Sequence, residues 1–238
     1  MKYATIAATI ASVAAYRDNS KMKIDLYYEA QCGACRNQIT TNFKKAINTF
    51  GFVEMADVTL HPYGNARESA GSDGQWTYQC QHGAAECQWN LLESCALDYN
   101  EQGVRNKWLS FHFIACIEGN DSSSNYEEVA TKCATETGQP NVDKLLSCMK
   151  GKQGNALEHK IAQETDALNP PHNFVPWLVV DGAHSDTIQR AVGSNLLGYV
   201  CQNYKGPHKA KACDQEFEFS TEDMEVHYKE ADQANFIY

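Results

Sequence analysis

Two cysteines separated by two residues carry the clearest chemistry in this sequence of 238 residues. Cys32 and Cys35 can close a small disulfide and open it again by thiol–disulfide exchange. We expect the pair at the first turn of a helix, where free N–H groups and partial positive charge stabilise a thiolate. Cys32 is therefore predicted to be the exposed nucleophile, and Cys35 the more buried thiol that resolves a mixed disulfide.

The segments around this pair favour a redox role. In residues 23–30 apolar and polar side chains alternate, as in a strand. After Cys35, apolar residues recur at helical spacing, and Gly51 ends the predicted helix. A second strand is predicted over residues 53–60, and a right-handed crossover would make the two strands parallel neighbours.

Three other interpretations of the pair stay open on the spacing alone. Cys32 and Cys35 could supply half of a zinc site, or form an inert bridge in a secreted binding module. A redox pair could also work as an oxidase or isomerase of the secretory pathway, because direction depends on reduction potential.

Residues 1–15 are predicted to be a secretory signal peptide. Lys2 precedes an apolar run that is too short to span a bilayer and ends in small residues near Ala15. All ten cysteines lie after this segment, and an even number is expected of an oxidising compartment. The sequon that begins at Asn120 is the predicted glycosylation site.

The charge balance excludes some partners. There are 20 Lys and Arg against 30 Asp and Glu, which gives a formal net charge of -10. This sign argues against a nucleic-acid partner and against an anionic membrane surface. No apolar run is long enough for a membrane span, and the sequence calls for no cofactor and no metal.

Further along the chain the pattern alternates between loops and helices. Residues 66–84 are rich in Gly, Ser and Gln and are predicted to be loop. Residues 88–166 are mostly helical and would form an insertion between two halves of a sheet. Residues 177–180 then form a buried strand that ends in a turn at Asp181-Gly182, and residues 186–204 form a last helix.

The other eight cysteines are predicted to form structural disulfides. They are Cys80, Cys87, Cys95, Cys116, Cys133, Cys148, Cys201 and Cys213. Cys80, His82 and Cys87 match no zinc spacing, so a disulfide-bearing loop is favoured there. Cys201 and Cys213 flank a short loop and are the suggested pair.

A proline stands directly before the predicted buried strand. Pro176 cannot donate to a ladder and is tolerated at a strand start. Its position fits either a plain loop-to-strand proline or a cis proline facing the two cysteines. In the second case the backbone of Val175 would pair with an extended substrate peptide.

Four segments together resemble one known family. They are residues 26–35 with the C-x-x-C pair, residues 58–66, residues 165–177, and residues 80–90, which fit C-Q-H-G-x-x-E-C-x-x-N. This chain is similar to the gamma-interferon-inducible lysosomal thiol reductases from about Lys23 to Cys213. The resemblance implies an α/β fold with a thioredoxin-like sheet, a disulfide-stapled helical insertion and a cis Pro176.

The sequence also predicts a domain plan, and the resemblance implies an activity. A thioredoxin-like domain would span residues 22–205, with the insertion over about 88–166. The acidic tail over 206–238 would be a solvated or disordered extension, or else a partner-binding segment. The implied activity is reduction of disulfides in protein substrates. A small thiol or a protein reductant would then restore the reduced enzyme. The implied setting is the lysosome or endosome, with secretion as the alternative, since the acidic tail and the single sequon depart from the family pattern.

An acidic setting places a demand on the nucleophile. A thiol with an ordinary pKa of about 8.5 is ionised in only about one molecule in 3,000 near pH 5. An acid-working reductase must therefore stabilise the thiolate, and the helix N-terminus, assisted by Arg36, is the expected source.

Overall fold

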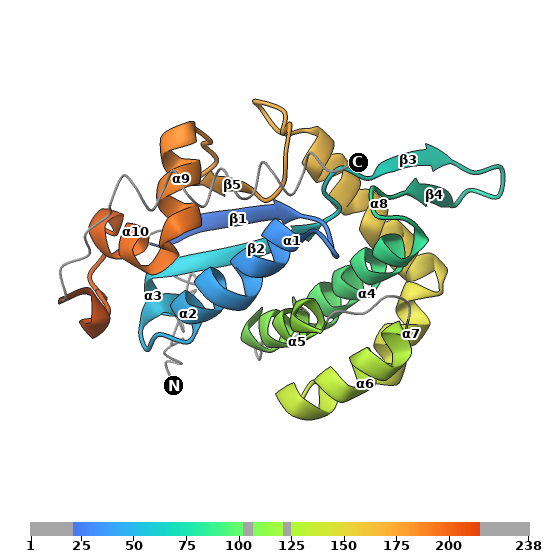
Figure 1. The fold of residues 1–238 in the computed structure, drawn as a ribbon, viewed down its shortest axis with the longest axis horizontal. Coiled ribbons are helices and arrows are strands. Elements are labelled where there is room, and N and C mark those ends of the chain that lie inside the picture. The colour runs from blue at the N-terminus through green and yellow to red at the C-terminus, as the bar shows by residue number, and fades with distance from the viewer. Residues whose placement is uncertain (1–20, 102–106, 121–124, 215–238) are drawn as a thin grey trace, which may run out of the picture.

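The computed structural model describes residues 21–101, 107–120 and 125–214. Its core is a three-stranded sheet in the order β2-β1-β5 (Figure 1). The central strand β1 (Met22–Tyr28) pairs in parallel with β2 (Ala56–Pro62) and antiparallel with β5 (Trp177–Val180). The parallel pair predicted from the crossover rule is therefore confirmed.

The alternating side chains of β1 explain its central place. Ile24, Leu26 and Tyr28 are fully buried, and Leu26 lies between Leu60 of β2 and Leu178 of β5. Burial of such side chains contributes about 1.5–3 kcal/mol each, which fixes the register of the sheet.

The crossover from β1 to β2 is a continuous helical run that carries the cysteine pair. It consists of α1 (Gly33–Asn37), a π-helical stretch η1 (Gln38–Phe43) and α2 (Lys44–Ile47). Ile39 and Phe43 are fully buried in the same cluster as the strands, so the predicted amphipathic helix packs on the sheet.

Two predictions for this half of the chain were wrong, one about where a strand begins and one about a loop. The second strand begins at Ala56, because the preceding residues form a helical turn, α3 (Phe52–Met55), that buries Phe52 and Met55. The predicted loop over 66–84 contains a hairpin of β3 (Arg67–Ala70) and β4 (Trp76–Gln79).

The hairpin escaped prediction because contacts distant in sequence hold it. Asn155 accepts a hydrogen bond from the Trp76 backbone N–H at 2.9 Å and donates one to the Trp76 carbonyl at 2.7 Å. The Trp76 ring also stacks on His159, with 3.9 Å between ring centroids.

Five helices follow the hairpin and lie beside the sheet (Figure 1). They are α4 (Ala84–Glu101), α5 (Lys107–Gly119), α6 (Tyr126–Thr137), α7 (Val142–Met149) and α8 (Lys152–Asp166). They share an apolar cluster around Trp89, Leu92 and Phe113. The disulfide Cys95–Cys148 joins α4 to α7, and Cys116–Cys133 joins α5 to α6.

The last predicted helix is divided in two. α9 (Asp186–Ser194) and α10 (Leu196–Asn203) meet at Asn195. Asn42 of η1 causes the break, because its side chain donates to the Val192 carbonyl at 2.8 Å and accepts from the Leu196 N–H at 2.9 Å.

The chain then continues to a short 3-10 turn, η2 (Lys211–Asp214), tied to α10 by the suggested disulfide Cys201–Cys213. The first part of the predicted tail over 206–238 is not a solvated extension, because Ala210 is 5% exposed in the main apolar cluster and Cys213 is bonded to Cys201. The rest of that tail, residues 215–238, and the predicted signal peptide lie outside the described residues.

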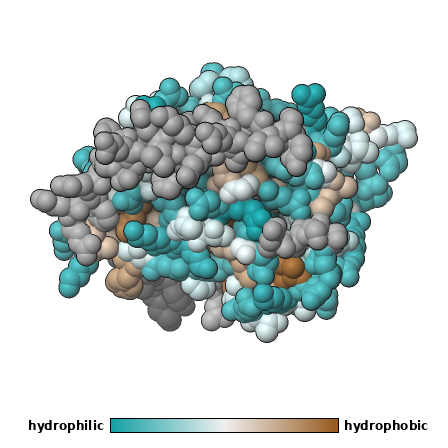
Figure 2. All heavy atoms as spheres, viewed as in Figure 1, coloured by the Kyte–Doolittle hydropathy of each residue, from teal (hydrophilic) through white to brown (hydrophobic). Residues whose placement is uncertain are grey.

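The surface is mainly hydrophilic on the face that Figure 2 shows. Among the described residues, the exposed large apolar side chains are Phe50, Val53 and Trp108. In the described part of the chain, every helix is too short or too polar to cross a bilayer.

The tight α7–α8 junction gives a test of the packing. A Cβ at Gly154 would lie 2.5 Å from the Cys148 carbonyl oxygen and 2.9 Å from the Met149 Cα. We expect Gly154→Ala to destabilise the protein by about 1–3 kcal/mol, seen as a lower Tm in thermal unfolding. Gly119→Ala is the matched control, since its Cβ would lie 3.8 Å from Thr40. An unchanged Tm for Gly154→Ala would contradict this packing.

Candidate active site

The cysteine pair lies at the start of α1, just beyond the end of β1. Cys32 is the N-cap residue of α1, and its Sγ accepts a hydrogen bond from the Cys35 backbone N–H at 3.4 Å. The Cys32 carbonyl accepts from the Arg36 N–H at 2.9 Å, which begins the helix. Cys32 therefore lies at the N-terminus of α1, where the sequence predicted the pair.

The predicted exposure of Cys32 was wrong. The residue is 2% exposed and belongs to the same apolar cluster as Val175. Its neighbour Gln31 has a φ of 68°, and this left-handed turn precedes the inward side chain of Cys32. Gly33 on the other side is exposed, so the sulfur lies just beneath the surface loop. The apolar residues packed around Cys32 therefore cover its side chain in this structure.

Cys35 is fully buried, as expected for the second thiol. Burial raises the pKa of the Cys35 thiol well above its ordinary value, and its hydrogen bond with Cys32 acts in the same direction. A hydrogen bond from the Glu29 backbone opposes this shift. The Cys35 thiol therefore favours its protonated form.

All other cysteines are paired. The bonds are Cys80–Cys87, Cys95–Cys148, Cys116–Cys133 and Cys201–Cys213, which leaves Cys32 and Cys35 as the free thiols. The pair is thus chemically distinct from the eight cysteines around it.

The proline segment before β5 has a buried support. The Val175–Pro176 peptide bond is cis, and Asn169–Pro170 is a second cis bond. Gln189 of α9 donates to the Pro176 carbonyl and accepts from the Leu178 N–H, both at 2.9 Å. The sequence analysis did not single out Gln189, although a polar residue on the apolar face of a predicted helix was a signal.

The disulfide Cys80–Cys87 joins the segment before α4 to the first turn of that helix. The Glu86 carboxylate accepts from the backbone N–H of Gln81 at 3.2 Å and of His82 at 2.7 Å. The His82 Nδ1 lies 2.5 Å from Glu86 and 3.6 Å from the Glu29 carboxylate. Among the described residues, these three side chains are the group that could hold a metal ion.

Beyond this loop, α4 reaches the residues that precede the cysteine pair. Asn90 Oδ1 accepts from the Ala30 backbone N–H at 2.9 Å. Tyr28 donates its hydroxyl to Glu93 at 2.5 Å, and Glu93 is hydrogen-bonded in turn to Glu118 of α5. These contacts connect residues 28–32, which we call the redox loop, to the helical insertion, which consists of α4 to α8.

Several buried glutamates lie near this junction, and no local sequence pattern predicts their burial. Burial raises the pKa of Glu29, Glu86 and Glu118 to about 7, and that of Glu158 to about 8. A carboxyl group in such a site favours its neutral form.

Two other predicted residues lie in α1 and at the end of α5. Arg36 donates its Nε to the Glu118 carbonyl at 2.7 Å, so its side chain reaches the insertion. Asn120 donates its amide nitrogen to the Cys116 carbonyl at 2.7 Å.

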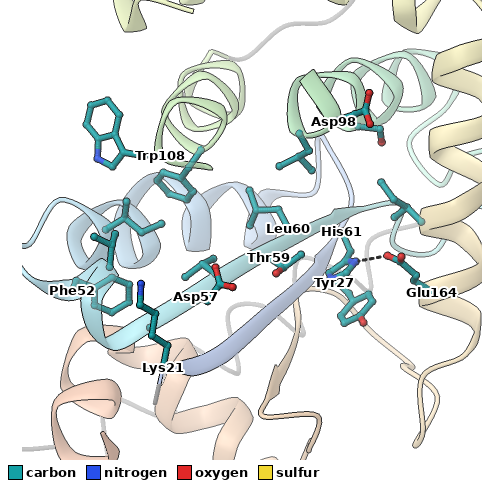
Figure 3. Close-up of a pocket in the computed structure, with 18 of the residues that line it drawn as sticks. Lys21, Tyr27, Phe52, Asp57, Thr59, Leu60, His61, Asp98, Trp108 and Glu164 are labelled. Carbon is teal, nitrogen blue, oxygen red and sulfur yellow. Dashed lines mark hydrogen bonds and ion pairs between the residues drawn. The ribbon is translucent and has the colours of Figure 1, made fainter. Parts of the chain in front are cut away.

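A separate cavity of about 700 Å³ lies along β2 (Figure 3). Its lining includes Trp108 and His61, but neither Cys32 nor Cys35. His61 lies 3.2 Å from Asp25 and 3.1 Å from Glu164. Burial lowers the pKa of His61, but hydrogen bonds to these two carboxylates outweigh that effect and raise it.

A free dithiol at a helix N-terminus, on a mixed sheet of this topology, defines a thiol–disulfide oxidoreductase of thioredoxin-like fold. The crystal structure of Chlamydia trachomatis DsbA shares this fold, with a TM-score of 0.53 and 16% identity over 79% of this chain and 95% of that one.

Sequence comparisons identify the family within that class. The model of the gamma interferon inducible lysosomal thiol reductase family matches residues 23–137. The gamma-interferon-inducible lysosomal thiol reductase of Mus musculus is 38% identical over 81% of this chain and 71% of its own length. That of Carassius auratus is 34% identical over 82% and 73%. This chain belongs to the family and is a thiol reductase that acts on disulfides, as the sequence analysis predicted.

The buried carboxyl groups give a prediction about pH. Glu158, which accepts a hydrogen bond from Ser94 at 2.7 Å, keeps its proton in the folded protein up to about pH 8, whereas the unfolded chain releases it from about 4.5 upward. Its contribution to the free energy of unfolding is thus full below about pH 4.5 and is lost as pH rises through 8. We expect the Tm to fall between about pH 5 and about pH 8.

Glu158→Gln should reduce this fall, because the amide stays neutral at both pH values. Exposed Glu54 supplies the control, Glu54→Gln, which should behave like wild type. Equal Tm losses in Glu158→Gln and wild type would contradict the assignment.

Proposed function

We propose that Cys32 is the nucleophile and Cys35 the resolving thiol of this reductase. The observation that carries the proposal is the position of the Cys32 sulfur, which receives the Cys35 N–H at 3.4 Å at the start of α1. The two residues are also the free thiols in a protein whose other cysteines are bonded.

The reaction proceeds in two exchanges. The Cys32 thiolate attacks one substrate sulfur, forms a mixed disulfide, and releases the other substrate sulfur as a thiolate that takes up a proton from water. Cys35 then gives its proton to water and attacks the Cys32 sulfur, which closes the Cys32–Cys35 disulfide. The second substrate sulfur leaves as a thiolate and takes up a proton from water. The substrate gains two electrons, and the enzyme dithiol loses them.

Substrate and reductant approach at the same loop. The Val175 and Pro176 backbone is proposed to bind an extended segment of the substrate, since Val175 shares an apolar cluster with Cys32. A small thiol or a protein reductant would return the Cys32–Cys35 disulfide to the dithiol.

The proposed setting is an acidic lysosomal or endosomal compartment, with secretion as the alternative. The names of the mouse and goldfish relatives support the lysosome. The buried carboxyl groups, which favour low pH, support an acidic place of work. Entry through a signal peptide over 1–15 and a glycan on Asn120 remain part of the proposal.

Insulin reduction separates this function from its rivals. We expect wild type to reduce insulin at about pH 5 and about pH 7, and Cys32→Ser to lose at least ~100-fold of that activity because no nucleophile remains. A Cys116→Ser/Cys133→Ser variant, which removes a structural bridge, is the control and should keep activity. Equal insulin turbidity with wild type and with Cys32→Ser, no greater than without protein, would support a non-catalytic binding module. Regeneration of scrambled ribonuclease would instead favour an isomerase.

The second thiol has its own test. We expect Cys35→Ser to accumulate a mixed disulfide with substrate, because resolution needs the Cys35 sulfur. Non-reducing mass spectrometry after incubation with insulin would detect the adduct on Cys32. Normal turnover without an adduct would assign resolution to another thiol.

A further inference from the structure

Three consecutive residues before the cysteine pair contact the segment that begins α4. Tyr28 donates its hydroxyl to Glu93, Glu29 lies 3.6 Å from His82, and the Ala30 N–H donates to Asn90. His82, Asn90 and the disulfide-bonded Cys80 and Cys87 belong to one stretch of eleven residues, 80–90, whose function the redox mechanism does not explain.

The contact at Ala30 matters because of the residue that follows it. Gln31 has a φ of 68°, a conformation that costs a non-glycine residue free energy and persists only where the surroundings fix it. Ala30 is 1% exposed, so its N–H has no access to water and depends on the Asn90 carbonyl oxygen. Cys32 stands directly after this turn.

The Asn90 side chain makes one hydrogen bond within the described residues. Its side chain is fully buried; Oδ1 bonds the Ala30 N–H, and Nδ2 has no hydrogen-bond partner. A buried amide with a single bond is expensive, because its unpaired group loses hydration without compensation. The bond to the redox loop is the contact that offsets this cost.

We propose that Asn90 is a positioning residue for the redox pair. Its side chain holds Ala30 in place, so that the Cys32 sulfur faces the Cys35 N–H. This inference rests on the proposed role of Cys32 as nucleophile. The titratable groups around the loop are Cys35 of α1, Glu29 and Tyr28 at the end of β1, His82 before α4, Glu86 and Glu93 of α4, and Glu118 of α5.

The rate of Cys32 alkylation by iodoacetamide, measured by mass spectrometry across pH, tests the proposal. We expect Asn90→Ala to slow alkylation at about pH 5 by ~5-fold or more, because the displaced sulfur loses the helix N–H that favours its thiolate. At about pH 9, where ordinary thiols ionise, the rates should agree within ~2-fold. A general loosening of the loop would instead raise the rate at both pH values.

Two further variants isolate the carbonyl oxygen. Asn90→Asp keeps an acceptor at the same place and replaces the unpartnered amide nitrogen with a second oxygen. At about pH 5 burial keeps such a carboxyl neutral, so alkylation there should stay within ~2-fold of wild type. Asn155→Ala removes a half-buried amide from the hairpin contact and should leave the profile unchanged. If Asn90→Ala does not fold, Asn90→Leu, which has a similar size and no acceptor, replaces it with the same expected loss.

The outcomes separate this inference from the proposed function. Wild-type insulin reduction with an unchanged alkylation profile in Asn90→Ala overturns the positioning role and leaves the function intact. An inactive wild type, or an active Cys32→Ser, overturns the function itself. Equal slowing in Asn90→Asp and Asn90→Ala also overturns the role of the carbonyl oxygen.

Discussion

The structure depends on one hydrogen bond between a backbone N–H and a sulfur atom. Cys32 caps α1 through its Sγ, so the residue that begins the helix is also the proposed nucleophile. Strand β1 ends four residues before Cys32. The buried residues of the helical run after Cys35 pack the helix against the sheet. Because the sulfur is the cap, any shift in the residues before it changes both the start of the helix and the environment of the thiol.

The helical insertion is therefore more than a covering for the sheet. Its helix α4 presents polar side chains to the end of β1, and buried carboxyl groups gather at that junction. Glutamates in such a place would be costly at neutral pH, but they are neutral and tolerable in acid. The same junction thus combines support of the redox loop with a preference for low pH, which agrees with the proposed compartment.

The sequence was sufficient where a local pattern was enough. Alternation in β1, the C-x-x-C spacing and the crossover rule predicted the strand pair and the site of the dithiol, and the short loop suggested Cys201–Cys213. It failed where distant residues decide the outcome. The hairpin needs Asn155, the break at Asn195 needs Asn42, and the burial of Cys32 follows an unusual turn at Gln31. No spacing rule indicates that Asn90 and Glu93 meet the redox loop, because these contacts join residues about sixty positions apart.

An enzyme that opens disulfides must survive its own chemistry and that of its reductant. Each of its four bridges has one half-cystine that solvent scarcely reaches: Cys87 is 8% exposed, Cys95 1%, Cys133 0% and Cys201 2%. An attacking thiolate needs a direct line to a sulfur, opposite the bond that breaks. The packing around these side chains blocks much of that approach. The four structural disulfides are therefore protected from the reducing conditions in which the enzyme must work.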